Sequence, residues 1–145
     1  MSRDPKCLFC KIVHGEIPSA RVLETDRAVA ILDINPVAKG HVLIIPRDHH
    51  AQVAELPDDL AAHVGSLVPR LTRAVVAATG ADGSNTIINS GRVAGQTIFH
   101  CHWHVIPRFE DDPVRWPWPH DSYLGDEMGR TASLIQRELG GHADD

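Results

Sequence analysis

Short runs of apolar residues, broken by turn-forming residues, dominate the first hundred positions of the chain. Two of these runs are separated only by Thr25-Asp26-Arg27, which predicts a β-hairpin. The turn signal Asn35-Pro36 then precedes a third run. In all, five strands are predicted: Arg21–Glu24, Ala28–Leu32, His41–Pro46, Thr86–Asn89 and Ile98–Pro107.

Helical spacing of apolar residues follows the third predicted strand. Leu56-Pro57-Asp58-Asp59 places a proline and two acids at the start of this helix, and Gly80 is its expected end. Pro69 lies within the pattern and predicts a kink or a break. A short helix or turn over Pro5–Val13 and a last helix from about Asp126 to Leu139 complete the pattern. Because most connections between strands are too short for parallel crossovers, we expect an α+β fold, an antiparallel sheet of about five strands with covering helices.

Length and charge exclude several classes of protein. A chain of 145 residues with 43% hydrophobic residues fits one domain with its own core. No apolar run approaches 18 residues, and no apolar stretch follows the N-terminus, so we expect no membrane span, no secretory signal and a cytoplasmic location. The net charge of −5, from 14 basic and 19 acidic residues, argues against nucleic acid or an anionic membrane as the main partner.

Histidines are unusually frequent and clustered. Six of the ten lie in two windows, 41–50 and 100–104. In a strand, His100, His102 and His104 would share one face, and the residues between them would form a core face: Phe99, Cys101, Trp103 and Val105. Neighbours on one face are about 6.6–6.8 Å apart, too far for all three imidazoles to reach one zinc ion through Zn–N bonds of about 2.0–2.1 Å. We therefore expect a division of labour among the three histidines, the alternative being an incidental polar face near the sheet edge.

The cysteines suggest a metal site. Three cysteines cannot form a full disulfide framework. Cys7-x-x-Cys10 has zinc-ligand spacing but fills half of a tetrahedral site, and His49 or His50 is the obvious source of a further ligand. A redox dithiol and a pair of packing cysteines are the alternatives. Cys101, on the predicted core face, is expected to be inert.

The histidine segment carries a family resemblance. His100–Ile106 matches the motif His-Φ-His-Φ-His-Φ-Φ, with Φ hydrophobic, of the histidine triad (HIT) family. The chain also resembles this family in further motifs, over about residues 7–107: Cys7-x-x-Cys10, Asp33–Pro36, Gly40–Pro46, Asn89 and Gly95–Thr97. It is most similar to bacterial hydrolases related to the Hint nucleoside phosphoramidases. The resemblance implies one HIT domain over residues 1–145, with its core at 7–107 and a variable tail at 108–145, in a homodimer that cleaves nucleotides at the α-phosphorus.

The same resemblance implies a role for each histidine. His102 would be the nucleophile, since a neutral imidazole can attack phosphorus and form a nucleotidyl-histidine that water then hydrolyses. His104 would contact the phosphate or the leaving group, and His100 would support the triad. His41 would lie behind the triad and orient it, the alternative being a satisfied core histidine.

A purine or related nucleotide is the implied substrate. Asp33 would bind the ribose hydroxyls, the alternative being an Asx turn before Asn35-Pro36. The phosphate would be bound by the loop before the triad together with two triad histidines: Asn89, Gly95, Gln96, Thr97, His102 and His104.

The resemblance also extends to the metal and the tail. It favours His49 over His50 and adds His100, which gives a closed structural zinc site of Cys7, Cys10, His49 and His100. Trp116 or Trp118 would reach the site across the dimer or pack at the subunit interface. We therefore expect a nucleotide hydrolase or transferase acting on nucleoside 5′-phosphoramidates or dinucleoside polyphosphates. The alternatives are a nucleotide-binding module with little turnover and a metallohydrolase with a catalytic zinc on His100 and His102.

Overall fold

The computed structural model describes residues 2–115 and 118–140. It divides the chain into two compact units, Met1–Asp112 and Pro113–Asp145. Within the described ranges, none of the helices has both the length and the hydropathy that a membrane crossing requires.

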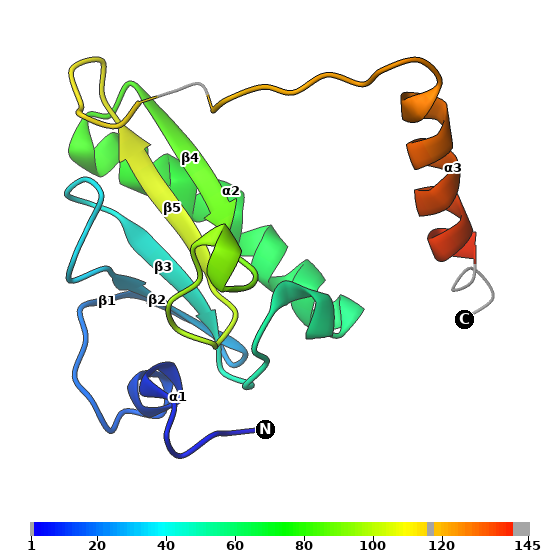
Figure 1. Ribbon diagram of the computed structural model, residues 1–145. Helices are drawn as coiled ribbons and strands as arrows, with labels where there is room; N and C mark the ends of the chain where they lie inside the picture. Colours follow the sequence, from blue (N-terminus) through cyan, green and yellow to red (C-terminus); the bar gives the residue numbers. More distant parts are fainter. Residues whose placement is uncertain (1, 116–117, 141–145) are drawn as a thin grey trace. The chain divides into compact units, whose positions relative to one another are not determined.

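A five-stranded sheet forms the centre of the first unit (Figure 1). The strand order is β1-β2-β3-β5-β4, and every neighbouring pair is antiparallel. The strands are β1 (Arg21–Glu24), β2 (Ala28–Leu32), β3 (Val42–Pro46), β4 (Gly83–Ile88) and β5 (Trp103–Arg108). The predicted α+β fold class and the predicted hairpin are confirmed.

Helices cover both faces of the sheet, as Figure 1 shows. Helix α2 (Asp58–Thr79) packs on one face, against alternate residues of β2 and β3 such as Ala30 and Ile44. Helix α1 (Leu8–Val13) packs on the other face, against the residues in between, such as Ile31 and Leu43. Because both faces are covered, the central strands are apolar at almost every position rather than alternating.

Helix α2 differs from its prediction at one point. It ends as expected at Gly80, which adopts a left-handed conformation with φ of 70°. The break considered at Pro69 does not occur, and the helix is continuous. Pro69 removes one backbone hydrogen bond to Gly65, and both residues lie on the exposed side of α2, where water can solvate the freed carbonyl.

Strand β5 begins five residues later than the sequence predicts. Residues 98–102 are irregular, and Phe99 is 47% exposed instead of lying in the core beside Cys101. Pairing between β3 and β5 ends at Ile44 and Trp103. Before that point the backbone bends, and Cys101 donates its N–H to His50 at 2.7 Å. This irregular approach allows the histidines of the motif to face different surroundings.

The second unit contains α3 (Glu127–Gly140), close to the range predicted for the last helix. The helix is amphipathic, and its large apolar side chains are exposed in this structure: Met128, Leu134, Ile135 and Leu139.

Candidate active site

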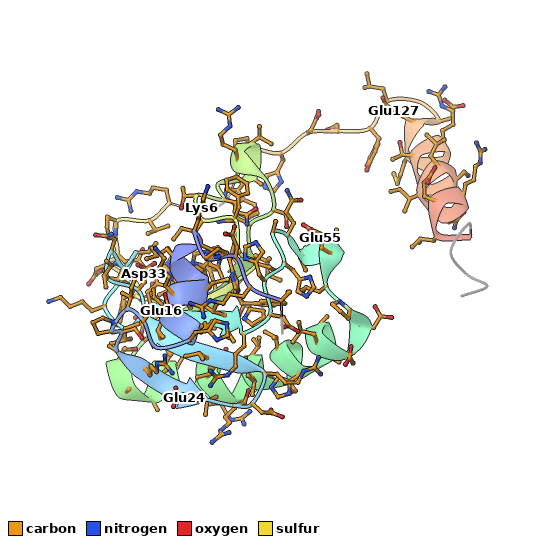
Figure 2. The ribbon with its side chains drawn as sticks, turned by 90° about the horizontal axis from the view of Figure 1, so that it is seen from below. Lys6, Glu16, Glu24, Asp33, Glu55 and Glu127 are labelled. Atoms are coloured by element: carbon orange, nitrogen blue, oxygen red, sulfur yellow. The ribbon has the colours of Figure 1, made fainter. Side chains whose placement is uncertain are left out.

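A cavity of about 430 Å³ lies on the side of the sheet that α1 covers. Its apolar wall comes from α1 and the segment that follows it, with Leu8, Phe9, Ile12, Ile17 and Pro18, and from the central strands. Its polar lining groups include Asp33, Thr97, His102 and His104. Figure 2 labels Asp33 and shows it near α1 in the view from this side. A mostly apolar cavity with a few polar lining groups suits a ligand that combines a flat base with a sugar phosphate.

The geometry around His102 fixes its tautomer. Its Nδ1–H donates to the backbone carbonyl of His100 at 2.7 Å, so Nε2 carries the free lone pair. The ring of Phe9 packs edge-on against this imidazole, with centroids 4.9 Å apart and planes at 90°. His102 is 8% exposed, and burial lowers its pKa. The side chain is therefore a neutral, oriented imidazole with an unprotonated Nε2 at the cavity.

A chain of hydrogen bonds sets the tautomer of His104. The backbone N–H of Val37 donates to Nδ1 of His41 at 3.1 Å, which leaves the proton of His41 on Nε2. That Nε2–H then donates to Nδ1 of His104 at 2.9 Å. His104 consequently holds its own proton on Nε2. Because His104 lines the cavity, this N–H is the donor that it can offer to a substrate.

Burial also keeps this pair of histidines neutral. It lowers the pKa of His104 to about 4, with further lowering by His102 and His41. The pKa of His41 is likewise lowered by burial, against an opposing effect of Asp33. Near pH 7 the donor to the cavity is therefore an uncharged imidazole.

Asp33 forms the Asx turn and also lines the cavity, and its role at a ribose stays a prediction. Its Oδ1 accepts the N–H of Asn35 at 2.8 Å, which is the Asx turn. Its side chain also lines the cavity, with Oδ2 3.8 Å from Nδ1 of His41. The turn thus holds a carboxylate in a fixed position beside the histidines.

The loop before the triad contributes less to the cavity than the sequence predicts. Thr97 lines it, but Asn89, Gly95 and Gln96 are not among the lining residues. Gln96 is 2% exposed, and its amide binds three backbone groups: it accepts from Gly91 at 2.8 Å and donates to Ala51 at 2.7 Å and Ile98 at 3.1 Å. Both N–H groups of this amide already donate to backbone carbonyls. Gln96 therefore shapes the loop and has no side-chain donor left for a phosphate.

Asn89 and Gly95 instead contact each other. Gly95 has a positive φ of 96°, and a side chain there would meet the Asn89 amide at 3.5 Å. The positive φ therefore favours glycine at this turn, while a side chain would make only ordinary van der Waals contact with Asn89.

His100 faces away from the cavity, toward the cysteines. It is fully buried, and its Nε2–H donates to the carbonyl of Pro46 at 2.7 Å. The remaining nitrogen, Nδ1, lies 3.5 Å from Sγ of Cys7 and 3.6 Å from Sγ of Cys10. His49 Nδ1 completes the group, 3.4 Å from Cys10 Sγ and 3.2 Å from His100 Nδ1. Both ring nitrogens of His100 are thus engaged, and none remains for a substrate.

These four side chains fit a tetrahedral zinc ion. With Zn–S bonds of about 2.3 Å and Zn–N bonds of about 2.0–2.1 Å, tetrahedral angles place sulfur and nitrogen about 3.5 Å apart and two nitrogens about 3.3 Å apart. The observed separations of 3.4–3.6 Å and 3.2 Å agree with these values. Backbone N–H groups of Asp4 and Cys10 also point at the sulfurs of Cys10 and Cys7, each at 3.4 Å. His50 is absent from this cluster.

Cys101 provides a contrast within the same segment. It is 1% exposed, and burial raises its pKa to about 11. The thiol stays protonated at neutral pH, as expected for an inert core residue.

Several groups that form the site could not be recognised from sequence motifs. Two are backbone groups, the carbonyl of Pro46 and the N–H of Val37, and their action depends on folding alone. Phe9 lies between the two cysteines in sequence, and helical spacing directs it away from them; this signal could have placed it on the cavity wall.

Comparison with known proteins identifies the family of this chain. The HIT domain family profile matches residues 14–111, about two thirds of the chain. This protein belongs to the histidine triad (HIT) family. The resemblance seen in the sequence is therefore confirmed, and the HIT segment ends within the first compact unit.

Two related HIT proteins carry names that describe an activity. One is Adenylylsulfatase HINT3 of Arabidopsis thaliana, 41% identical over 92% of this chain and 69% of the relative. Another is Adenosine 5′-monophosphoramidase HNT1 of Candida albicans, 35% identical over 96% of this chain and 95% of the relative. Both names describe nucleotide hydrolases, and the present HIT protein is an enzyme of this broad class.

Solved structures share the fold. A HIT family protein from Bacillus subtilis aligns with a TM-score of 0.86 at 39% identity, over 91% of this chain and 96% of the other. A zinc-bound histidine triad family protein from Mycobacterium smegmatis aligns with a TM-score of 0.72 at 36% identity, over 93% of this chain and 97% of the other.

The tail residues considered for the site belong to the second unit. Trp116 lies outside the described residues, and Trp118 is 64% exposed. The role of either tryptophan at a partner's site stays a prediction.

Proposed function

We propose that this HIT protein hydrolyses nucleoside 5′-phosphoramidates and related nucleotides at the α-phosphorus, through a nucleotidyl group on His102. One observation carries the proposal: Nε2 of His102 is held with a free lone pair at a cavity that also contains Asp33. The names of the Arabidopsis and Candida relatives support the substrate class, since each names cleavage at an adenylyl group.

The reaction follows from the two tautomers. Nε2 of His102 attacks the α-phosphorus, a P–N bond forms to the imidazole, and the bond from phosphorus to the leaving amine or oxygen breaks. The leaving group takes up a proton from solvent, and the attacking water of the second step returns one. The Nε2–H of His104 donates a hydrogen bond to the phosphate or the leaving group. Water then attacks the same phosphorus and releases the nucleoside monophosphate, which restores His102.

Base and sugar recognition use the remaining lining. The apolar wall from α1 suits the face of a purine, which gains more from burial than a smaller pyrimidine. The Asp33 carboxylate can accept hydrogen bonds from both vicinal ribose hydroxyls.

The alternative of a catalytic zinc on His100 and His102 finds no support in the positions of these side chains. In the part of the chain that the structure describes, the cysteine-containing cluster includes His100 but not His102. Four protein ligands also leave no open coordination position for a reactive water.

We propose instead a structural zinc ion on Cys7, Cys10, His49 and His100. The sulfur–nitrogen and nitrogen–nitrogen separations support it, as does the zinc-bound relative from Mycobacterium smegmatis. When bound, the ion supplies cross-linking of the N-terminal segment to the sheet and no reaction step. Thiolate ligands and free cysteines persist in a reducing compartment, which favours the cytoplasm.

We also propose a homodimer with two-fold symmetry, the most common oligomeric state. Within the sheet of the described residues, β4 is an edge strand and can pair with a second copy. Light scattering should give twice the chain mass of 15.9 kDa at micromolar concentration. A mass equal to one chain would overturn the dimer.

A substrate panel tests the proposed activity. The purified protein is incubated with adenosine and guanosine 5′-phosphoramidates, adenosine 5′-phosphosulfate and diadenosine polyphosphates, and release of nucleoside monophosphate is measured. We expect turnover of at least one phosphoramidate. Binding of AMP without turnover of any substrate would instead identify a nucleotide-binding module.

A further inference from the structure

Helix α1 contributes to two sites at once. Cys7, its N-cap, and Cys10 belong to the metal cluster. Leu8, Phe9 and Ile12, from the same helix, line the nucleotide cavity. The two sites are therefore opposite sides of one short element.

The two ends of α1 are held differently. At six residues, the helix is too short to be stable by itself, so tertiary contacts decide its position. Two arginines hold its C-terminal end: Arg21 donates to the carbonyl of Ile12 at 2.6 Å, and Arg47 donates to that of Val13 at 3.0 Å. At the N-terminal end, the polar side-chain contacts to the triad segment are those of the Cys7 and Cys10 sulfurs with His100. These are long contacts that a shared metal ion would replace with coordinate bonds.

Phe9 links this helix to the nucleophile. Its side chain is 3% exposed and lies between the cysteines in sequence. Its ring contacts that of His102, with centroids 4.9 Å apart, and also lies near that of His100, at 6.0 Å. A shift of the N-terminal end of α1 would therefore move the cavity wall and release one side of His102.

We propose that zinc binding and nucleotide binding are coupled through α1, with Phe9 as the positioning residue that carries the coupling. The inference rests on the nucleotide and zinc sites proposed above. Zinc holds α1 in the position that completes the cavity wall, and a bound nucleotide packs against that wall and holds α1 against the metal. By linkage, the two affinities change by the same factor.

Two measurements on the wild type test this reciprocity. Calorimetry gives the Kd of AMP for the zinc-loaded protein and for protein stripped with a chelator, and we expect at least about fivefold weaker binding to the stripped form. A colorimetric chelator gives the rate of zinc loss, and we expect saturating AMP to slow it by at least about fivefold. The release rate is measured on the loaded protein, so it decides the question even where the stripped form unfolds.

A pair of variants tests the role of Phe9. In Phe9→Ala, AMP should no longer slow zinc loss, and the difference in AMP affinity between loaded and stripped protein should disappear. Ile17→Ala is the matched control, because Ile17 lines the same cavity from outside the helix. It should weaken AMP binding in both forms and keep the effect of zinc.

The possible failures are distinguishable. AMP affinity and zinc loss that are independent of each other would overturn the coupling and leave the proposed function intact. Coupling that survives in Phe9→Ala would overturn the role of that residue. Absence of AMP binding to the zinc-loaded protein would overturn both the proposed function and the coupling.

Discussion

His100 and His104 lie four residues apart and carry the same side chain, but their ring nitrogens bind different kinds of group. His100 is fully buried, with one ring nitrogen bound to the Pro46 carbonyl and the other directed at two cysteines. His104 is partly exposed, accepts a hydrogen bond from His41, and keeps one N–H for the cavity.

The group bound to one ring nitrogen of a histidine determines whether the other nitrogen carries a lone pair or a proton. A carbonyl acceptor forces the lone pair to the far nitrogen, as in His100 and His102. A donor that binds one ring nitrogen instead leaves the proton on the far nitrogen, as in His104. The first arrangement suits a metal ligand or a nucleophile, and the second suits a hydrogen-bond donor to a substrate.

The largest expected effect comes from the histidine between them. Replacing His102 with Ala removes the nucleophile, and kcat should fall by about 10⁴-fold or more. The affinity for AMP, measured by calorimetry, should change little because the cavity wall remains. His50→Ala serves as the control and should keep full turnover, since His50 lies outside the metal cluster and the cavity lining. Turnover of His102→Ala at the wild-type rate would remove the basis for the proposed mechanism.

Substitutions at the proposed zinc ligands should lower stability more than they lower turnover. Cys7→Ser and Cys10→Ser should each lower the zinc content, from about one ion per chain, and lower Tm by about 5 °C or more, because the unfolded chain lacks the preformed ligand set. Elemental analysis and calorimetry check both quantities.

His49→Ala should behave like the cysteine variants, and His50→Ala should retain zinc and stability. A protein that contains no zinc, and whose Tm does not respond to a chelator, would leave Cys7 and Cys10 as packing residues.

A substitution at Asp33 tests recognition of the sugar in the cavity. Asp33→Asn keeps an oxygen for the Asx turn but removes the charge that accepts ribose hydroxyls, so KM for a ribonucleotide should rise about tenfold. With the 2′-deoxy substrate, wild type and variant should differ much less. An equal loss with both substrates would show that Asp33 acts on the fold or on His41 and not on the sugar.

A further expected effect is a pH dependence of stability. The pKa of His104 is about 4 in the folded protein, against an ordinary value of 6.5. Between these values the unfolded chain binds more protons, so the free energy of unfolding should fall as the pH decreases from about 6.5 to about 4. Urea titrations across this range measure the fall.

The same titrations on His104→Gln should show a shallower fall. The groups that face His104, namely His41, His102 and Asp33, remain in both proteins, so the difference isolates His104. Identical slopes would show that His104 does not resist protonation in the folded state.

Local patterns were sufficient for most of the fold. The hairpin β1–β2 and helix α2 follow from apolar spacing and turn residues, which act over a few neighbouring positions. Residues 98–102 do not, because their path is set by distant groups: the Pro46 carbonyl holds His100, and the His50 carbonyl holds Cys101. Strict alternation therefore placed Phe99 in the core, where it does not lie.

The candidate site, like the fold, was predictable from the sequence only in part. The positions of Asp33, His102 and His104 at one cavity agree with the roles that the family resemblance implies. Gln96 shows the limit of a motif, since its sequence position suggests a phosphate donor while its amide is consumed by backbone groups. Hydrogen-bond capacity of this kind depends on contacts between residues far apart in the sequence, such as Gln96 and Ala51.

The proposed mechanism requires that the free Nε2 of His102 accepts the nucleotidyl group and that His100 and His104 do not. The direct measurement is rapid mixing with adenosine 5′-phosphoramidate, quenching in alkali to preserve the phosphorus–nitrogen bond, and peptide mapping by mass spectrometry. We expect an adenylyl group on His102 that forms and decays at rates compatible with turnover. An adenylyl group on His104, or turnover with no adduct on any histidine, would contradict it.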